Sequence, residues 1–148
     1  MKPSLIVLFI FSASVLLAGP VKAYSETISL PARDSITRDV QVNVEDVVSG
    51  RVTIIGPAIN FSITDPDGNV ILNRTVSNPL DFKVTAATSG VYKLHFENLH
   101  SDNAKHVTLN YNVQHYIFGF PQEFIILFAI VGFALIGVVV FVAMSPRP

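Results

Sequence analysis

Hydrophobic and polar residues alternate through most of the middle of the chain. The clearest run covers residues 107–113, where Val, Leu and Tyr alternate with Thr and Asn. A period of two is typical of half-buried β-strands, because successive side chains point to opposite faces. In the run at 40–44, Val40, Val42 and Val44 are expected on the buried side. The same pattern predicts strands at 59–63 and 92–96, with shorter ones at 51–55, 70–74 and 80–85.

Turn residues separate these strands. Asp65-Pro66-Asp67-Gly68 has Asp first, Pro second and Gly fourth, as a type I turn favours. Further turns are expected at Ser49-Gly50, Gly56-Pro57, Asn78-Pro79 and Ser89-Gly90. No window has a sustained helical stripe, so we expect an all-β fold, an antiparallel β-sandwich of seven or eight strands.

A different pattern begins near the C-terminus. Residues 124–144 are 21 positions without a charge, a length of about 31 Å as a helix, enough to cross a hydrocarbon core of about 30 Å. Tyr116, Phe118 and Phe120 supply aromatic residues near the expected interface. The segment has small residues but no Gly-x-x-x-Gly pair, which favours a plain lipid-facing anchor and leaves helix pairing, and hence an oligomer, open.

The N-terminus has the features of a secretory signal peptide. Lys2 precedes an apolar run at 5–18, Gly19-Pro20 breaks it, and Val21-Lys22-Ala23 resembles a cleavage site, so cleavage is expected after Ala23. A retained signal anchor is the alternative, although fourteen apolar residues are short for a membrane span. The expected organisation is a signal peptide at 1–23, an extracytoplasmic sandwich at 24–115, a membrane-proximal collar at 116–123, a transmembrane helix at 124–144 and a cytoplasmic tail at 145–148. This is a single-pass type I topology.

Composition agrees with this division. The 148 residues are 50% hydrophobic and 14% charged, with a mean hydropathy of +0.50, but 15 hydrophobic residues lie in 1–23 and 19 in 124–144. What remains suffices for one domain, which excludes a multidomain enzyme or a polytopic transporter. The absence of Cys excludes disulfides and zinc–thiolate sites.

The residues give no sign of catalysis or of a cofactor. Phosphate-loop, dinucleotide and nucleophile-elbow motifs are absent, and so is His-Glu-x-x-His. The glycine of Asp65-Pro66-Asp67-Gly68 is too early for a calcium loop. A zinc or copper site among His95, His100, His106 and His115 is less favoured than four surface histidines. We therefore expect no enzyme, no cofactor and no metal site.

The charge of the central region bears on one class of partner, and two sequons mark candidate modification sites. Residues 24–123 hold seven basic and eleven acidic side chains, a net charge of −4, which argues against nucleic acid. Asn60-Phe61-Ser62 and Asn73-Arg74-Thr75 satisfy the glycosylation sequon, so Asn60 and Asn73 are candidate sites if the host glycosylates.

Several of these features together resemble the GOLD (Golgi dynamics) domain. The resemblance runs from Ile28-Ser29-Leu30 through the 65–68 turn and the run SGVYKLHFEN at 89–98 to Lys105-His106-Val107. It is closest to the TMED (Emp-type) transmembrane cargo receptors, in which similar turn and strand motifs recur. The residues that match these motifs are Asp65, Pro66, Gly68, Gly90, Tyr92, Phe96 and Asn98.

The chain also departs from that family. The positions of the family's disulfide correspond to Ser35 and His95, and the membrane-proximal coiled coil and the coat-binding tail signals are absent. These losses suggest a minimal prokaryotic, archaeal relative at the cell membrane; a eukaryotic relative would lie in the endoplasmic reticulum or Golgi membrane.

The resemblance implies a membrane-anchored adaptor that binds other proteins, as cargo receptors of vesicular protein transport do. The alternative is a structural accessory subunit of a larger membrane complex. The expected partners are the lipid bilayer and other proteins.

Overall fold

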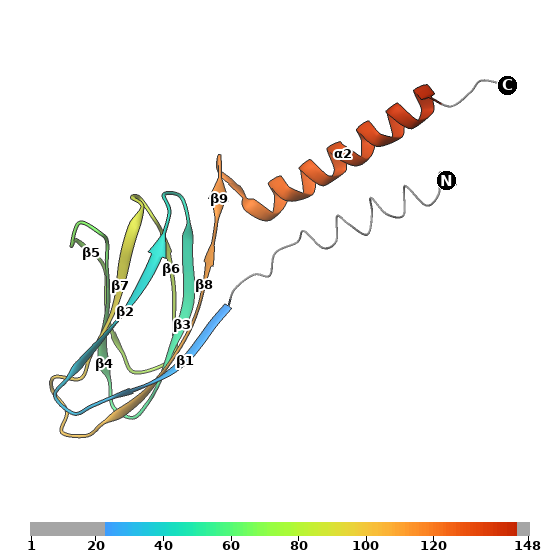
Figure 1. Cartoon of the computed structure of the whole chain (residues 1–148). Helices are drawn as coiled ribbons and strands as arrows, with labels where there is room; N and C mark the ends of the chain where they lie inside the picture. Colours follow the sequence, from blue (N-terminus) through green and yellow to red (C-terminus); the bar gives the residue numbers. More distant parts are fainter. Residues whose placement is uncertain (1–22, 145–148) are drawn as a thin grey trace. The chain divides into compact units, whose positions relative to one another are not determined.

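The computed structural model describes residues 23–144; the expected signal peptide, apart from Ala23, and the expected tail lie outside the described residues. The described residues form two compact units, 23–116 and 117–144. The first unit is the β-sandwich (Figure 1). Its strands are β1 (Ala23–Leu30), β2 (Ser35–Val42), β3 (Val47–Ile55), β4 (Ile59–Thr64), β5 (Val70–Val76), β6 (Leu80–Thr85), β7 (Gly90–Glu97) and β8 (Lys105–Gln114).

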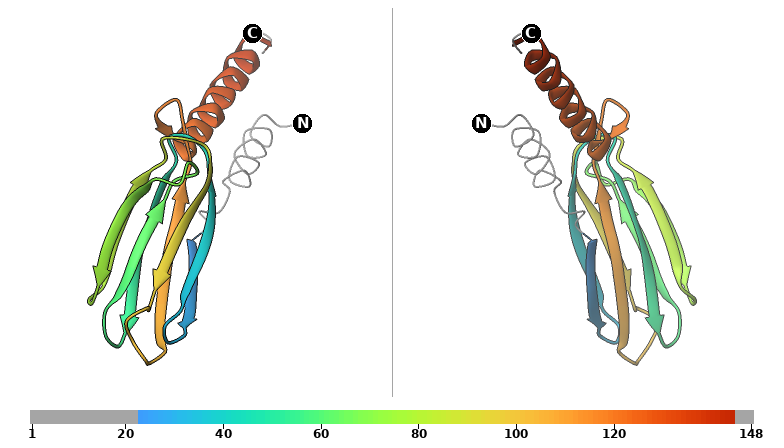
Figure 2. Two further views of the ribbon diagram at one scale, coloured as in Figure 1. Left: turned by 90° about the vertical axis from the view of Figure 1, so that its left-hand side faces the viewer. Right: turned by 90° about the vertical axis from the view of Figure 1, so that its right-hand side faces the viewer.

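These strands form two four-stranded antiparallel sheets, which Figure 1 shows side by side as two layers and Figure 2 shows from their faces. One sheet has the order β1-β8-β3-β6 and the other β2-β7-β4-β5. Ala23 lies opposite Asn112, so the start of β1 and the end of β8 share one end of the sandwich. The loops after β1, β3, β5 and β7 lie at the other end, which we call the distal end. The predicted all-β sandwich is confirmed.

The core consists of the inward-facing positions of both sheets. Phe61 and Phe96 are fully buried, with their ring centroids 5.0 Å apart, and Phe82 of the opposite sheet lies 5.4 Å from Phe61. This aromatic cluster joins the layers without a disulfide. Burying each large side chain contributes about 1.5–3 kcal/mol, so packing alone can stabilise a domain of this size.

Two strand predictions were wrong in detail. Val44 does not continue β2, because the chain turns after Val42 and leaves Val44 exposed in the loop to β3. Ser49-Gly50 is not a turn but lies inside β3. A Cβ on Gly50 would collide with the Asn110 carbonyl oxygen and would lie 2.8 Å from the Phe82 ring and from Tyr111 Cβ, so this glycine allows the neighbouring strands to approach closely.

The expected counterpart of His95 also changes. The register of β2 and β7 places Thr37 opposite His95, whereas Ser35 lies opposite Glu97. Thr37 Oγ1 is 2.7 Å from His95 Nδ1. A polar cross-strand pair therefore occupies the place where the family resemblance implied a lost disulfide between Ser35 and His95.

A short hairpin and a helix follow the sandwich strands. β9 (Tyr116–Ile117) pairs with β10 (Phe120–Pro121), and α2 (Gln122–Met144) has 23 residues. Pro121 directly precedes this helix, a position compatible with its missing amide hydrogen. The helix begins two residues before the expected span and ends at the same residue; it is long and apolar enough to cross a membrane.

Candidate functional site

The turn between β4 and β5 is held by Asp65. Gly68 N–H donates to Asp65 O at 3.1 Å, which closes the predicted four-residue turn, and Gly68 has a φ of 87°. The Asp65 carboxylate accepts from the Asn69 backbone N–H at 2.7 Å and from the Asn69 amide at 2.9 Å. These hydrogen bonds, that of the Asn69 side chain foremost, hold the pKa of Asp65 below its usual value.

The structure brings this turn against the start of β7. A Cβ on Gly90 would lie 2.8 Å from Pro66 Cγ, and Gly90 has a φ of 148°. A larger residue at Gly90 would therefore meet both steric and conformational resistance. Further along β7, Tyr92 and Phe96 are buried in the core. These matched residues form the scaffold of the domain rather than an exposed site.

Asn98 joins two loops at the distal end. Its Nδ2 donates to Pro31 O at 2.8 Å and to Asn103 O at 2.9 Å. Its backbone N–H donates to Asp34 O, and its carbonyl accepts from the backbone N–H groups of Arg33 and Ser101. Because two carbonyl groups face the amide nitrogen, the orientation of the amide is determined, and among the described residues no donor reaches the buried Oδ1.

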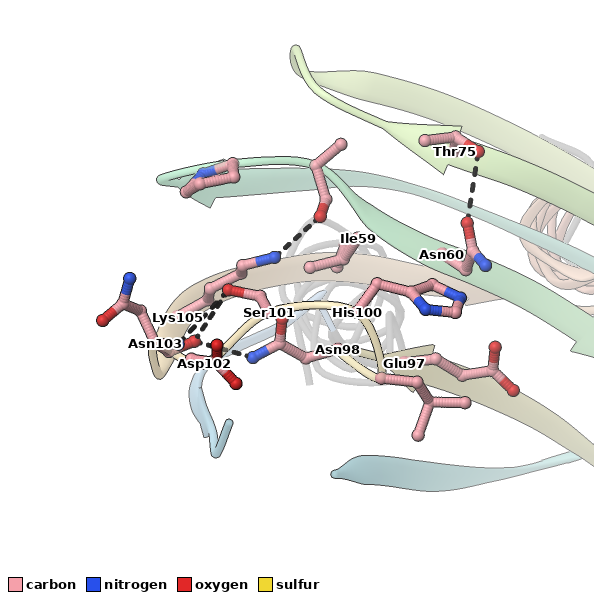
Figure 3. A pocket seen from close by; sticks show the side chains of 13 residues that line it. Ile59, Asn60, Thr75, Glu97, Asn98, His100, Ser101, Asp102, Asn103 and Lys105 are labelled. Carbon is pink, nitrogen blue, oxygen red and sulfur yellow. Dashed lines mark hydrogen bonds between the residues drawn. The ribbon is translucent and has the colours of Figure 1, made fainter. Parts of the chain in front are cut away.

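An open hollow lies beside this junction at the distal end (Figure 3). Its volume is about 570 Å³, and the β3–β4 and β7–β8 loops contribute most of its wall. The lining includes half-buried Asn60, exposed Leu99 and exposed His100. Lys105, which is buried, donates from Nζ to Ala58 O at 2.7 Å, and none of the described acidic side chains pairs with it. The site thus combines a buried ammonium group with an apolar side chain and several amides and hydroxyls.

The hollow continues onto the outer face of the β2-β7-β4-β5 sheet, here named the polar face. Two rows of polar side chains cross its four strands. The rows are Ser35, Glu97, Asn60 and Thr75, and Thr37, His95, Ser62 and Asn73. Three members of the first row also line the hollow.

Both sequons lie on the polar face, opposite one another. Asn60 faces Thr75 across the β4–β5 ladder, and Asn73 faces Ser62. Thr75 Oγ1 donates to Asn60 Oδ1 at 3.1 Å. Asn73 is exposed on the edge strand β5, whereas Asn60 is half-buried on a strand paired on both sides. Thus one sequon asparagine is engaged in cross-strand pairing and the other faces solvent.

The four histidines occupy separate environments. His95 Nε2 is 3.1 Å from Glu97 Oε1 on the polar face, and His100 lines the hollow. His106 lies on β8, and His115 follows that strand. In residues 23–144, no three His, Asp or Glu side chains come together as a metal-binding group.

Two buried charged residues had no signal in the sequence. Asp46 lies in the β2–β3 loop and accepts from Asn43 N–H and His115 Nδ1, both at 2.8 Å, and from Tyr116 N–H at 3.3 Å. It therefore fixes the point at which the chain leaves the sandwich. Lys105 is the other. A charged residue in a polar stretch is normally exposed, so only the fold reveals the burial of either side chain.

Solved structures with a similar fold come from proteins of low sequence identity. The periplasmic inhibitor PliG of g-type lysozyme from Aeromonas hydrophila matches with a TM-score of 0.52 and 16% identity, covering 66% of this chain and 91% of that one. The Yersinia pseudotuberculosis-derived mitogen has a TM-score of 0.49 at 8% identity, covering 66% and 91%. The pre-peptidase C-terminal domain of Bacillus anthracis collagenase has the same TM-score at 12% identity, covering 63% and 97%. The first supports the fold alone.

The family comparison is more informative. No curated protein matches the chain, but the model described as emp24/gp25L/p24 family/GOLD matches residues 27–119. That range includes all eight sandwich strands except the first four residues of β1, and it confirms the GOLD resemblance. The chain therefore belongs to the emp24/gp25L/p24 (GOLD) family.

Proposed function

We propose that this protein is a membrane-anchored adaptor that binds other proteins through its sandwich. Membership in the family, whose members are non-enzymatic cargo receptors, supports a cargo-receptor-like role in vesicular transport. The observation that carries the proposal is the combination of a GOLD domain at 27–119 with the apolar helix Gln122–Met144 on one chain. In this proposal the helix holds the binding domain at a membrane, and the protein catalyses no reaction.

The hollow and the adjoining polar face are the surface on which we place the partner. The hollow has a volume typical of ligand sites, but it is open, and its wall is a mixture of polar and apolar groups. Such a surface suits a loop of a folded protein better than an enclosed small molecule. Most residues of the hollow lie on loops of a rigid sandwich, where binding residues are common.

The chemistry of the hollow indicates how such a loop would be held. Leu99 offers an exposed apolar contact. Lys105 Nζ uses one of its three donors on Ala58 O, so a carbonyl or carboxylate oxygen of the partner fits beside it. Asn60 and Thr75 can add hydrogen bonds at the rim. The proposed partner segment is therefore mixed in character, with an acceptor near an apolar residue.

Photocrosslinking tests the location of this surface. Leu99 is replaced by p-benzoylphenylalanine in the full-length chain in its own membranes, and adducts are identified by mass spectrometry. Val44, which is equally exposed at the other end of the sandwich, carries the same group as the control. We expect adducts only from Leu99, and a decrease when His100→Ala is added. Equal labelling at both positions, or no effect of His100→Ala, would contradict the proposal.

The membrane orientation is a separate part of the proposal. With the signal peptide removed after Ala23, the sandwich would be extracytoplasmic and residues 145–148 cytoplasmic. Cleavage there would shorten β1 by one residue, because Ala23 is its first residue. The chain has no Cys, so Thr75→Cys and Ser145→Cys each create a single thiol. A membrane-impermeant maleimide should label the first in intact cells and the second only after lysis; the reverse order would refute type I topology.

We also propose that Asn73, rather than Asn60, is the modified sequon in a glycosylating host. Asn73 lies exposed on an edge strand, while Asn60 is half-buried and bonded to Thr75. Asn73→Gln should abolish the glycosidase-sensitive mass shift, and Asn60→Gln should leave it unchanged. A shift that survives Asn73→Gln would show that this choice between the sites is wrong.

The alternative of an accessory subunit rests on the exposure of α2, none of whose residues is buried in the part of the chain that the structure describes. Such a helix can face lipid or pack on another subunit. Purification in mild detergent distinguishes the two functions. One partner at a fixed stoichiometry would favour the subunit, and varied partners at low stoichiometry would favour the adaptor.

A further inference from the structure

The short hairpin before α2 has an unusual turn. β9 and β10 have two residues each and are joined by Phe118 and Gly119, which have φ values of 53° and 77°. Two positive φ angles are the signature of a type I′ hairpin turn, where Asn-Gly is the favoured pair. Gly119 fits its position, but Phe118 does not, because a bulky residue at positive φ is an outlier.

Burial among the described residues does not offset this strain at Phe118. Its side chain is 89% exposed, and Phe120 on β10 is 60% exposed. Asparagine at position 118 would form the same turn with less strain and better solvation. Neither the hairpin nor any other described part of the chain buries the large apolar ring, so the folding of the hairpin does not explain it.

The position of the hairpin in the chain, directly before the apolar helix, indicates what the ring could contact. β10 ends at Pro121 and α2 begins at Gln122, so the apolar helix follows the hairpin without a linker (Figure 1). Two strand residues span about 7 Å, which limits the distance between the turn and the helix start. The headgroup region of a bilayer is itself about 5–7 Å thick on each side of the hydrocarbon core. The turn therefore remains within reach of the membrane interface.

We propose that the β9–β10 hairpin is a second membrane contact, with the Phe118 ring inserted at the boundary between headgroups and acyl chains. Phe120 would lie in the same layer, since aromatic rings are favoured there. The partner is the lipid surface. A hairpin held in the interface, together with the span, restrains the tilt and rotation of α2, which a single apolar helix leaves free. This role does not depend on which protein the sandwich binds.

Tryptophan fluorescence tests the insertion directly, because the chain contains no Trp. Phe118→Trp and, in a second protein, Phe120→Trp are made in the full-length chain and reconstituted into phosphatidylcholine vesicles. Leu99→Trp, in the exposed β7–β8 loop, is the matched control. Lipids brominated at different acyl positions quench emission according to depth, and acrylamide quenches from water.

We expect Phe118→Trp and Phe120→Trp to emit at shorter wavelength than Leu99→Trp, with strong quenching by lipids brominated near the headgroup and weak quenching by acrylamide. Equal acrylamide quenching of Phe118→Trp and Leu99→Trp would overturn the proposal, because the ring would then be in water. Protection from both quenchers would also overturn it, since the ring would then be packed on protein. Near-UV circular dichroism checks that each variant is folded.

Discussion

Replacement of Asn98 by Ala should destabilise the sandwich although it removes no hydrophobic contact. Asn98 is 2% exposed, and its amide nitrogen bonds Pro31 O and Asn103 O, one carbonyl on each of two loops. The first of these partners is 67 residues away in the chain. Asn98→Ala removes both bonds and leaves the two loops joined by backbone hydrogen bonds and by the exposed Arg33–Asp102 ion pair.

The expected loss follows from the value of each bond. A neutral hydrogen bond contributes about 1 kcal/mol net, so two give about 2 kcal/mol, with more lost if the carbonyls stay shielded from water. The substitution also removes the buried, unpaired Oδ1, which offsets part of this loss of stability. A change of about 2 kcal/mol lowers the Tm of a domain of this size by roughly 8–16 °C. At neutral pH, Asn98→Asp should lower the free energy of unfolding more than Asn98→Ala does, because a carboxylate oxygen would face two carbonyl oxygens.

Urea unfolding of the full-length chain in mild detergent, followed by near-UV circular dichroism, measures these changes. Asn110→Ala is the control, since Asn110 is exposed on β8 and should change the free energy of unfolding by less than about 0.5 kcal/mol. The gap between Asn98→Asp and Asn98→Ala should narrow at low pH, where a protonated acid regains one donor. The reasoning is refuted if Asn98→Ala changes the free energy of unfolding as little as the control does, or if Asn98→Asp is as stable as Asn98→Ala at neutral pH.

Three further predictions use the same unfolding assay, the last together with an NMR titration. Gly50→Ala should lower the free energy of unfolding by about 1–3 kcal/mol, because its methyl group would collide with the Asn110 carbonyl oxygen and the Phe82 ring; an unchanged midpoint would contradict the packing. Asp46→Ala should cost about 3 kcal/mol, since it leaves backbone donors without their charged acceptor; a smaller loss than for Asn98→Ala would contradict this. The lowered pKa of Asp65 means that its stabilising effect is present above the unfolded pKa and is lost as pH falls through the folded one. The difference in free energy of unfolding between the wild-type protein and Asp65→Asn should therefore shrink in acid. By NMR, the Asp65 carboxyl group should have a titration midpoint below 3.8; a midpoint at or above 3.8 would refute the bonding to Asn69.

The fold was predictable where one face of a strand is buried. Alternation correctly predicted strands around Phe61, Phe96 and Leu109, because burial on one side imposes a period of two. β1 was not predicted by alternation, since only Ile28 and Leu30 are buried in it, and only the family resemblance pointed to it. Gly50 was misread as a turn because glycine marks either a turn or a close approach, and the Asn110 carbonyl and Phe82 ring that decide between them come from two other strands.

The hollow could not be predicted, because residues far apart in the chain build it. Asn98 matched a family motif, but its bond to Pro31 depends on how β1 and β7 end in space. The burial of Lys105 depends on Ala58 O. Sequence periodicity reports which face of one element is buried, whereas these contacts depend on the arrangement of three loops.

The matched motif residues explain why the family can be recognised while its partner cannot. Gly90 accommodates Pro66, Tyr92 and Phe96 fill the core, and Asn98 joins two loops, so each is constrained by the fold and none requires a particular ligand. The side chains of the hollow are free of that constraint wherever they are exposed, as Leu99 and His100 are. Under the adaptor proposal, changes at these exposed positions should therefore alter the partner without altering stability, while changes at the motif should abolish every interaction together. The specificity of the protein then resides in the loops that the motif supports rather than in the motif itself.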